Sequence, residues 1–315
     1  MPNFRDEAPT KTWSARLPAA LLTLALTLTA CATSTGQPRE DGRLLVLTTF
    51  TVIADMARNV ADGRVEVASL TRPGAEIHGY EPTPEDLVRG QGADLILENG
   101  LGLEAWFAQF TEDVQAPTAV LTEGIETIPI SSGGYEGEPN PHAWMSPDNA
   151  HVYVDNIRDA LTELDPGGED VYARAAEDYK ARISEVDDYL ETELAEVPEG
   201  SRALVTCEGA FSYLARDAGL TEMYLWPVNA ESQSTPQQTV AVTEFVREHR
   251  VPAVFCESTV NDSVQRSVAR ETGARMGQTL YVDSLSEEDG PVPTYLDLLR
   301  HDAEAVVSGL KEGAT

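Results

Sequence analysis

The sequence predicts an α/β fold of two lobes, each with a parallel β-sheet flanked by helices, joined by one long rigid helix. Two observations lead to this prediction. In both halves of the 315-residue chain, short β-branched apolar runs alternate with amphipathic segments, which is typical of parallel sheets. Between the halves, residues 170–197 carry apolar side chains at helical spacing, enough for a helix of roughly 40 Å.

The N-terminal lobe is expected over residues 43–146. Its apolar runs are rich in β-branched side chains and predict buried strands. A helix is predicted to begin at Thr83-Pro84, because proline and acidic residues are favoured in the first turn. In chain order, the expected strands are RLLVLTTF, VEVASL, DLILEN and TAVLT, and the expected helices are TVIADMARNVA, the segment from Pro84 and GLGLEAWFAQF (100–110).

A helical segment is expected over residues 147–200 and the C-terminal lobe over residues 201–315. One stripe of the linking helix is predicted to be buried: Val171, Ala175, Tyr179, Ile183, Val186, Leu190, Leu194 and Val197. Strand candidates in the C-terminal lobe are RALVTCEG, MYLWPV, AVFCES and TLYVDS, with TPQQTVAVTEFVREH as one of the helices between them. A rigid linking helix limits hinge bending, so we expect local loop movement around His142 and Asp283.

The N-terminus looks like a bacterial lipoprotein signal over residues 1–30. Basic residues precede the apolar run LPAALLTLALTLTA, which is too short to span a membrane as a mature helix. Cleavage before Cys31 and lipidation there leave residues 31–42 as a flexible tether, since ATSTGQPREDG is small and polar. Ordinary secretory cleavage with an incidental cysteine is the alternative. The protein is therefore expected to be extracytoplasmic and lipid-anchored to the outer face of the bacterial cell membrane.

The composition is strongly acidic, with 22 Lys+Arg against 53 Asp+Glu and a net charge of −31. Affinity for nucleic acid comes mainly from basic side chains that neutralise phosphates, so this balance argues against a nucleic-acid partner. An anionic membrane surface is an equally poor partner, which leaves the lipid anchor as the expected membrane contact. No run after residue 30 reaches the about 18 apolar residues of a transmembrane helix.

Four polar residues are predicted at the carboxyl ends of strands, where open parallel sheets bind ligands. His78 follows VEVASL and His142 follows TAVLT in the N-terminal lobe, whereas Glu208 ends RALVTC and Asp283 ends TLYV in the C-terminal lobe. Two imidazole nitrogens with carboxylate oxygens suit a first-row divalent metal. Taken singly, each residue has an ordinary structural explanation, as a surface histidine or a helix-capping carboxylate.

The flanking sequence resembles a known family. HGYEPTPEDL (78–87), ADLILENGLGLEAW (93–106) and NPHAWMSP (140–147) are similar to motifs of the metal-binding lipoproteins, the solute-binding subunits of zinc, manganese and iron ABC importers. CEGAFSYLARDAGL (207–220) and YVDS (281–284) resemble segments of that family's second domain. The similarity runs in the same order over essentially the whole chain after the signal segment.

The resemblance implies a metal ligand at each of the four positions. The histidines of the family's H-x-Y-E-P and P-H-x-W motifs fall on His78 and His142, its His-or-Glu third ligand falls on Glu208, and its final aspartate falls on Asp283. It also implies one divalent ion as transported cargo and an ABC importer permease in the cytoplasmic membrane as partner.

Residues next to the four ligands are weaker candidates. Tyr80 and Glu81 closely follow His78 and are predicted to orient its ring, with capping and packing as the alternative. His151 is expected on a helix, away from the metal, and His249 and His301 are expected at the surface. Trp144 and Trp226 are expected to pack in the wall of the cleft rather than to form stacking platforms.

The identity of the metal is predicted from two departures from zinc-binding relatives. The third ligand position is occupied by Glu208 where members thought to carry zinc usually have histidine, and the segment 122–140 contains no histidine. An oxygen-rich site favours Mn²⁺ or Fe²⁺, and NPHAWMSP resembles the manganese/iron branch. We therefore expect Mn²⁺ first and Fe²⁺ next, with Zn²⁺ able to bind in vitro.

Cys207 and Cys256 are the cysteines that follow Cys31, and each directly precedes an acidic residue at a predicted strand end. If their strands are neighbours, their Cα atoms lie about 5 Å apart, within disulfide range. An extracytoplasmic location permits the bond. Two buried, inert thiols are the alternative.

The predicted function is capture of a divalent metal ion and its delivery to the permease by a monomeric binding protein, without catalysis. The alternatives are a zinc-specific binding protein of the same family, a secreted metalloenzyme with the same two histidines and two carboxylates, and an adhesin with a structural metal. An enzyme needs an open coordination position and a positioned acid or base, and no such extra group stands out.

Overall fold

The computed structural model describes residues 42–107, 110, 114–228 and 234–311, all within one compact unit. The signal segment, Cys31 and nearly all of the tether lie outside the described residues, so these three remain predictions. In the part of the chain that is described, no helix combines the length and the apolar character needed to cross a bilayer.

The first sheet contains the four strands predicted for the N-terminal half. β1 (Leu45–Thr48), β2 (Glu66–Ser69), β3 (Leu95–Glu98) and β4 (Thr118–Val120) are all parallel, in the order β2-β1-β3-β4. Two predicted helices are also present, α1 (Thr51–Ala61) and α2 (Pro84–Gln91). Thr83 and Asp86 form a capping box that begins α2, where the sequence predicts a helix start.

The second half repeats this arrangement. β5 (Ala203–Glu208) pairs with β6 (Thr221–Trp226), and β7 (Ala253–Val254) pairs with β8 (Arg275–Met276), both in parallel. The Phe255 N–H donates to the Val205 carbonyl at 2.8 Å, which places β7 beside β5 and gives the same strand order as in the first sheet. The helices of this half are α6 (Ser212–Asp217), α7 (Pro236–Glu248), α8 (Ser263–Thr272) and α9 (Tyr295–Lys311).

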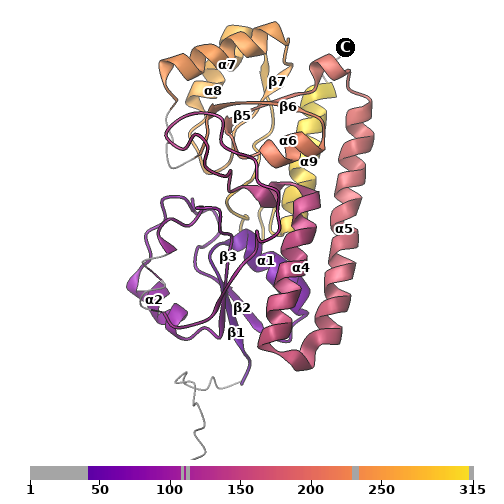
Figure 1. The fold of residues 1–315 in the computed structure, drawn as a ribbon. Helices are drawn as coiled ribbons and strands as arrows, with labels where there is room; N and C mark the ends of the chain where they lie inside the picture. Colours follow the sequence, from indigo (N-terminus) through magenta and orange to yellow (C-terminus); the bar gives the residue numbers. More distant parts are fainter. Residues whose placement is uncertain (1–41, 108–109, 111–113, 229–233, 312–315) are drawn as a thin grey trace, which may run out of the picture. The chain divides into compact units, whose positions relative to one another are not determined.

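Two long helices join the halves. Figure 1 shows α4 (Pro147–Leu164) beside α5 (Glu169–Ala195), with a short 3-10 turn between them. The 27 residues of α5 pack against α1 of the first half and α9 of the second. The predicted α/β class, with parallel sheets flanked by helices and a long helix, is confirmed. The domain limits at residues 43, 147 and 201 remain predictions.

The buried stripe of α5 differs from the prediction in its first two turns. Tyr172 and Ala176 are buried there, whereas the predicted Val171 and Ala175 are only half-buried. The Tyr172 hydroxyl donates to Asp165 at 2.8 Å, so a tertiary contact turns this residue inward. The remaining six residues of the predicted stripe are buried.

The helix predicted over residues 100–110 is wrong for residues 101–106, which form turns. Gly100, Leu101 and Gly102 have φ values of 84°, 54° and 77°. Three successive residues with positive φ are incompatible with a right-handed helix.

The predicted strand TLYVDS is also wrong, because only Leu280 forms an isolated bridge. The Gly277 N–H donates to the Val254 carbonyl at 2.8 Å, and the Leu280 N–H donates to the Cys256 carbonyl at 3.0 Å. Between these two bonds the segment after β8 advances three residues and the segment after β7 advances two. The extra residue after β8 forms a bulge, which ends the regular β7–β8 ladder. Asp283 therefore lies in irregular backbone rather than at a strand end.

Cys207 at the end of β5 and Cys256 just after β7 are joined in a disulfide, with their Cα atoms 4.9 Å apart. A covalent link between these segments restricts the unfolded chain more than the folded one, because the bond spans 49 residues of sequence.

We expect replacement of both Cys207 and Cys256 by alanine to lower the free energy of unfolding by about 2–4 kcal/mol. Denaturant unfolding of the double variant beside the parent protein measures the change. As a control, thiol titration of the unreduced protein in denaturant, in a Cys31→Ser background, should find no free thiol. Two free thiols per chain would contradict the disulfide.

Candidate metal centre

The four residues predicted as ligands meet at one point in the structure. His78 comes from the loop after β2, and His142 directly precedes the 3-10 turn η1 (Ala143–Met145). Glu208 is the last residue of β5, and Asp283 follows the bulged segment after β8. One potential ligand atom from each side chain lies within 4.8 Å of the other three.

The distances are those expected of atoms that share one ion. The Nε2 atoms of His78 and His142 are 3.1 Å apart, and each is 3.4 Å from Glu208 Oε1. Asp283 Oδ1 is 3.9 Å from His142 Nε2. Two ligand atoms bound at about 2.1 Å to a tetrahedral ion are about 3.4 Å from one another. Two nitrogens and two carboxylates at this spacing suit a first-row divalent metal.

Burial separates His78 from the other three residues. The side chains of His142, Glu208 and Asp283 are fully buried, whereas that of His78 retains 5% exposure. His78 also lines a cavity of about 440 Å³, with Tyr135 among the other residues. The open side of the site is therefore the His78 side.

Asn140 fixes the orientation of the His142 ring. Its Oδ1 accepts the His142 backbone N–H at 3.0 Å and lies 2.9 Å from His142 Nδ1. An amide oxygen can only accept, so Nδ1 carries a proton and Nε2 is turned toward the other proposed ligands. Asn140 Nδ2 donates to the Gly209 carbonyl at 2.6 Å, directly after Glu208. One amide thus holds ligands from both halves in place.

Glu76 holds the backbone of the loop that carries His78. Its carboxylate accepts the backbone N–H groups of His78 at 2.8 Å and Gly79 at 2.9 Å. The Tyr80 hydroxyl donates instead to Asp86 at 2.8 Å, and Glu81 is exposed. A role for Tyr80 and Glu81 in orienting the His78 ring stays a prediction.

The buried charges shift the pKa values at the site. Burial lowers the pKa of His78, but the hydrogen bond and charge of Glu208 outweigh burial and raise it to about 9. Burial works to raise the pKa of Glu208, but His142 and His78 lower it to about 2. Burial and repulsion from Glu208 raise the pKa of Asp283 to about 6 and that of Glu257 well above its ordinary value.

Sequence reasoning missed Asn140, Glu76 and Glu257. Asn140 stands in the NPHAWMSP segment two residues before His142, so its position was a usable signal. Glu257 Oε2 accepts the Glu208 N–H at 3.2 Å, a contact that depends on β5 and β7 lying together. No spacing pattern in the sequence predicts the contact between Glu208 and Glu257.

The other histidines contact different groups. His151 Nε2 lies 3.2 Å from the Ser184 hydroxyl, and the His249 ring stacks on Phe245. His301 Nε2 lies 2.8 Å from the Thr279 carbonyl.

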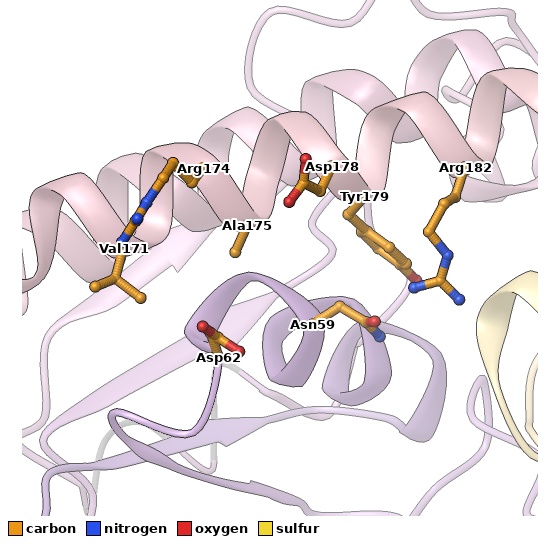
Figure 2. A pocket seen from close by; sticks show the side chains of 8 residues that line it. All are labelled: Asn59, Asp62, Val171, Arg174, Ala175, Asp178, Tyr179 and Arg182. Carbon is orange, nitrogen blue, oxygen red and sulfur yellow. The ribbon is translucent and has the colours of Figure 1, made fainter.

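A second cavity, of about 430 Å³, lies between α1 and α5. Figure 2 shows that Arg174, Asp178 and Arg182 of α5 face this groove together with Asp62 after α1. Its charged lining residues are two arginines and two aspartates, so it lacks the excess of negative charge that would attract a cation.

A family model described as zinc-uptake complex component A, periplasmic (ZnuA), matches residues 46–309. The chain belongs to this family. The iron-binding protein YfeA of Yersinia pestis is 51% identical over 265 residues, which cover 84% of this chain and 85% of YfeA. The resemblance to metal-binding lipoproteins is thereby confirmed.

Solved structures match the fold of this ZnuA-family chain closely. The Mn-bound periplasmic metal binding protein from Candidatus Liberibacter asiaticus is 40% identical with a TM-score of 0.81, over 85% of this chain and all of that one. The periplasmic zinc binding protein TroA from Treponema pallidum is 27% identical with a TM-score of 0.77, over 85% and 99% of the two chains. YfeA is named for iron binding and TroA for zinc binding, and the Liberibacter protein is named only for metal binding, so the names alone do not select one metal.

The raised pKa of His78 predicts how metal affinity depends on pH. Because this pKa is about 9, the imidazole of the metal-free protein carries a proton at neutral pH. A metal that takes the Nε2 lone pair must displace that proton, so affinity should fall on acidification by about tenfold per pH unit. Calorimetry at neutral pH in buffers of different ionisation enthalpy should show about one proton released per ion. Binding without proton release contradicts this expectation.

The contacts of Asn140 predict a loss of affinity in the variant Asn140→Ala. Without the amide, the His142 ring is no longer held with Nε2 toward the site, and metal affinity should fall about 10- to 100-fold. Asn156→Ala is the matched control, because Asn156 donates to Leu121 and Glu123 carbonyls away from the four ligands. Titration of both variants with Mn²⁺ measures the difference, and equal affinities would show that Asn140 does not orient the ring.

Proposed function

We propose that this protein is the extracytoplasmic substrate-binding lipoprotein of a metal ABC importer, which captures one divalent ion and delivers it to the permease. The observation that carries the proposal is the convergence of His78, His142, Glu208 and Asp283, two residues from each half, within 4.8 Å. Membership of the ZnuA family supports the importer role.

The proposed cargo is Mn²⁺ first and Fe²⁺ second. Two carboxylates and two imidazoles form a harder ligand set than a site with three histidines, and this favours Mn²⁺ and Fe²⁺ over Zn²⁺ in relative terms. YfeA, with 51% identity, is named as an iron-binding protein, and the 40% identical structure is Mn-bound. The Irving–Williams order still allows Zn²⁺ to bind in vitro, so a zinc-specific importer is the alternative.

Binding without catalysis is the proposed activity. A metalloenzyme keeps a coordination position open and places an acid or base beside it. Here two described carboxylates next to the proposed ligands already accept backbone N–H groups: Glu257 that of Glu208, and Glu76 those of His78 and Gly79. The family is described as a component of an uptake complex, which supports transport over both hydrolysis and adhesion.

The proposed state is a monomer held by a lipid on Cys31. The residues before Gly42 then act as a tether that keeps the binding unit near a permease in the same membrane. A short tether raises the effective concentration of the partner, so that weak docking is sufficient for delivery.

The test is the metal content of the purified protein after equilibration with limiting Mn²⁺, Fe²⁺ and Zn²⁺ under anaerobic conditions. We expect about one ion per chain, and loss of most of it in His78→Ala and in Glu208→Ala, because each removes a ligand. His249→Ala and Glu248→Ala are matched controls on exposed residues near the end of α7.

Retention of the metal in both ligand variants would overturn the site. Metal uptake by cells that lack the protein tests the cargo. A defect in manganese or iron uptake supports the proposal, whereas a defect in zinc uptake alone supports the alternative.

A further inference from the structure

Three of the four proposed ligands lie outside strands and helices: His78, His142 and Asp283. Asn140 orients the ring of His142, which leaves His78 and Asp283 to be explained. His78 belongs to the loop between β2 and α2, and Asp283 lies beyond the bulge that ends the pairing with β7. Glu208, in contrast, is part of β5 and is fixed by its ladder. The positions of His78 and Asp283 therefore depend on tertiary contacts.

The same kind of hydrogen bond occurs next to His78 and next to Asp283: an indole N–H donates to the carbonyl of the preceding residue. Trp106 Nε1–H donates to the Ile77 carbonyl at 3.2 Å, and Ile77 directly precedes His78. Trp144 Nε1–H donates to the Val282 carbonyl at 3.1 Å, and Val282 directly precedes Asp283. In each case an indole N–H holds the peptide group that enters the ligand residue.

We propose that Trp106 and Trp144 are positioning residues of the metal site, each of which holds one ligand through its indole N–H. Trp106 holds His78, and Trp144 holds Asp283. This inference rests on the proposed function, and it adds two residues that set how long the ion is retained.

Trp144 also connects the two halves of the site. Its side chain is fully buried, and its ring centroid lies 5.2 Å from that of His142, two residues earlier in the chain. Its own carbonyl accepts a hydrogen bond from the Tyr295 hydroxyl at the start of α9. Trp144 thus links the segment of His142 to the segment of Asp283 through its indole N–H and to α9 through its carbonyl.

Trp106 is held less firmly. Its ring packs edge-on against Tyr80, with centroids 5.2 Å apart, and its side chain is only partly buried. The Ile77 carbonyl also accepts the Tyr80 N–H at 3.4 Å, so loss of the indole N–H leaves it one weaker donor. The effect of Trp106 should therefore be smaller than that of Trp144.

The experiment replaces each indole by benzothienylalanine, which keeps the shape of the ring and removes the N–H. Trp144→benzothienylalanine should raise the rate at which a chelator removes Mn²⁺ by about 3- to 10-fold, the effect of one hydrogen bond, and Trp106→benzothienylalanine by less. Trp226→benzothienylalanine makes the same change in the apolar cluster behind β5 and should leave the rate within about twofold. Trp144→Phe serves as a second, genetically simple variant, with its melting temperature measured beside its dissociation rate.

Double variants separate positioning from general packing. If Trp144 acts through Asp283, its replacement should change nothing further in an Asp283→Ala background but keep its effect in a His78→Ala background. Trp106 should show the opposite pattern. A purely structural role would give equal effects in both backgrounds and overturn the inference.

The metal affinities of the ligand variants and the dissociation rates of the indole variants together distinguish an error in the positioning role from an error in the proposed function. If His78→Ala and Asp283→Ala weaken binding but the indole replacements leave the dissociation rate of the parent protein unchanged, the positioning role is wrong and the metal site stands. If neither ligand variant alters binding, the site itself is wrong, and the positioning role is overturned with it.

Discussion

The burial of several carboxylates around one point governs the charges and hydrogen bonds of the whole site. Glu208, Asp283 and Glu257 are at most 2% exposed and interact electrostatically with one another. Negative charge in such a place is stable only beside positive charge or as the protonated acid. The imidazolium of His78 meets this need in part, which is why the pKa of His78 rises to about 9. The proposed divalent cation would supply two positive charges at the same place.

The repeated sheet topology explains how such a site can form at all. Each half orders its strands in the same way, and Glu208 ends a strand of its half, whereas His78 lies in the loop that follows one. Asn140 donates across to Gly209, and α5 packs on helices of both halves. The proposed site therefore lies between residues contributed by both halves, which also share one hydrophobic core.

The sequence predicted the regular elements well, because their signals are local. The apolar runs LVLT, LILE and ALVTCE became strands, and the Thr83-Pro84 start became a capping box. The prediction failed where tertiary contacts decide the backbone, at Leu101 with its positive φ and at the bulge before Leu280. At the site, the proposed ligands stand in recognisable motifs. The bonds of Asn140 to Gly209 and of the two indoles to Ile77 and Val282 join residues far apart in the chain, and no periodicity encodes those.

Whether one ion binds all four side chains at once can be measured by anomalous diffraction at the manganese edge from crystals grown with Mn²⁺. We expect one strong peak at about 2.0–2.3 Å from the Nε2 atoms of His78 and His142 and from oxygens of Glu208 and Asp283. A peak elsewhere on the chain, or one that contacts only one half of the molecule, would contradict it.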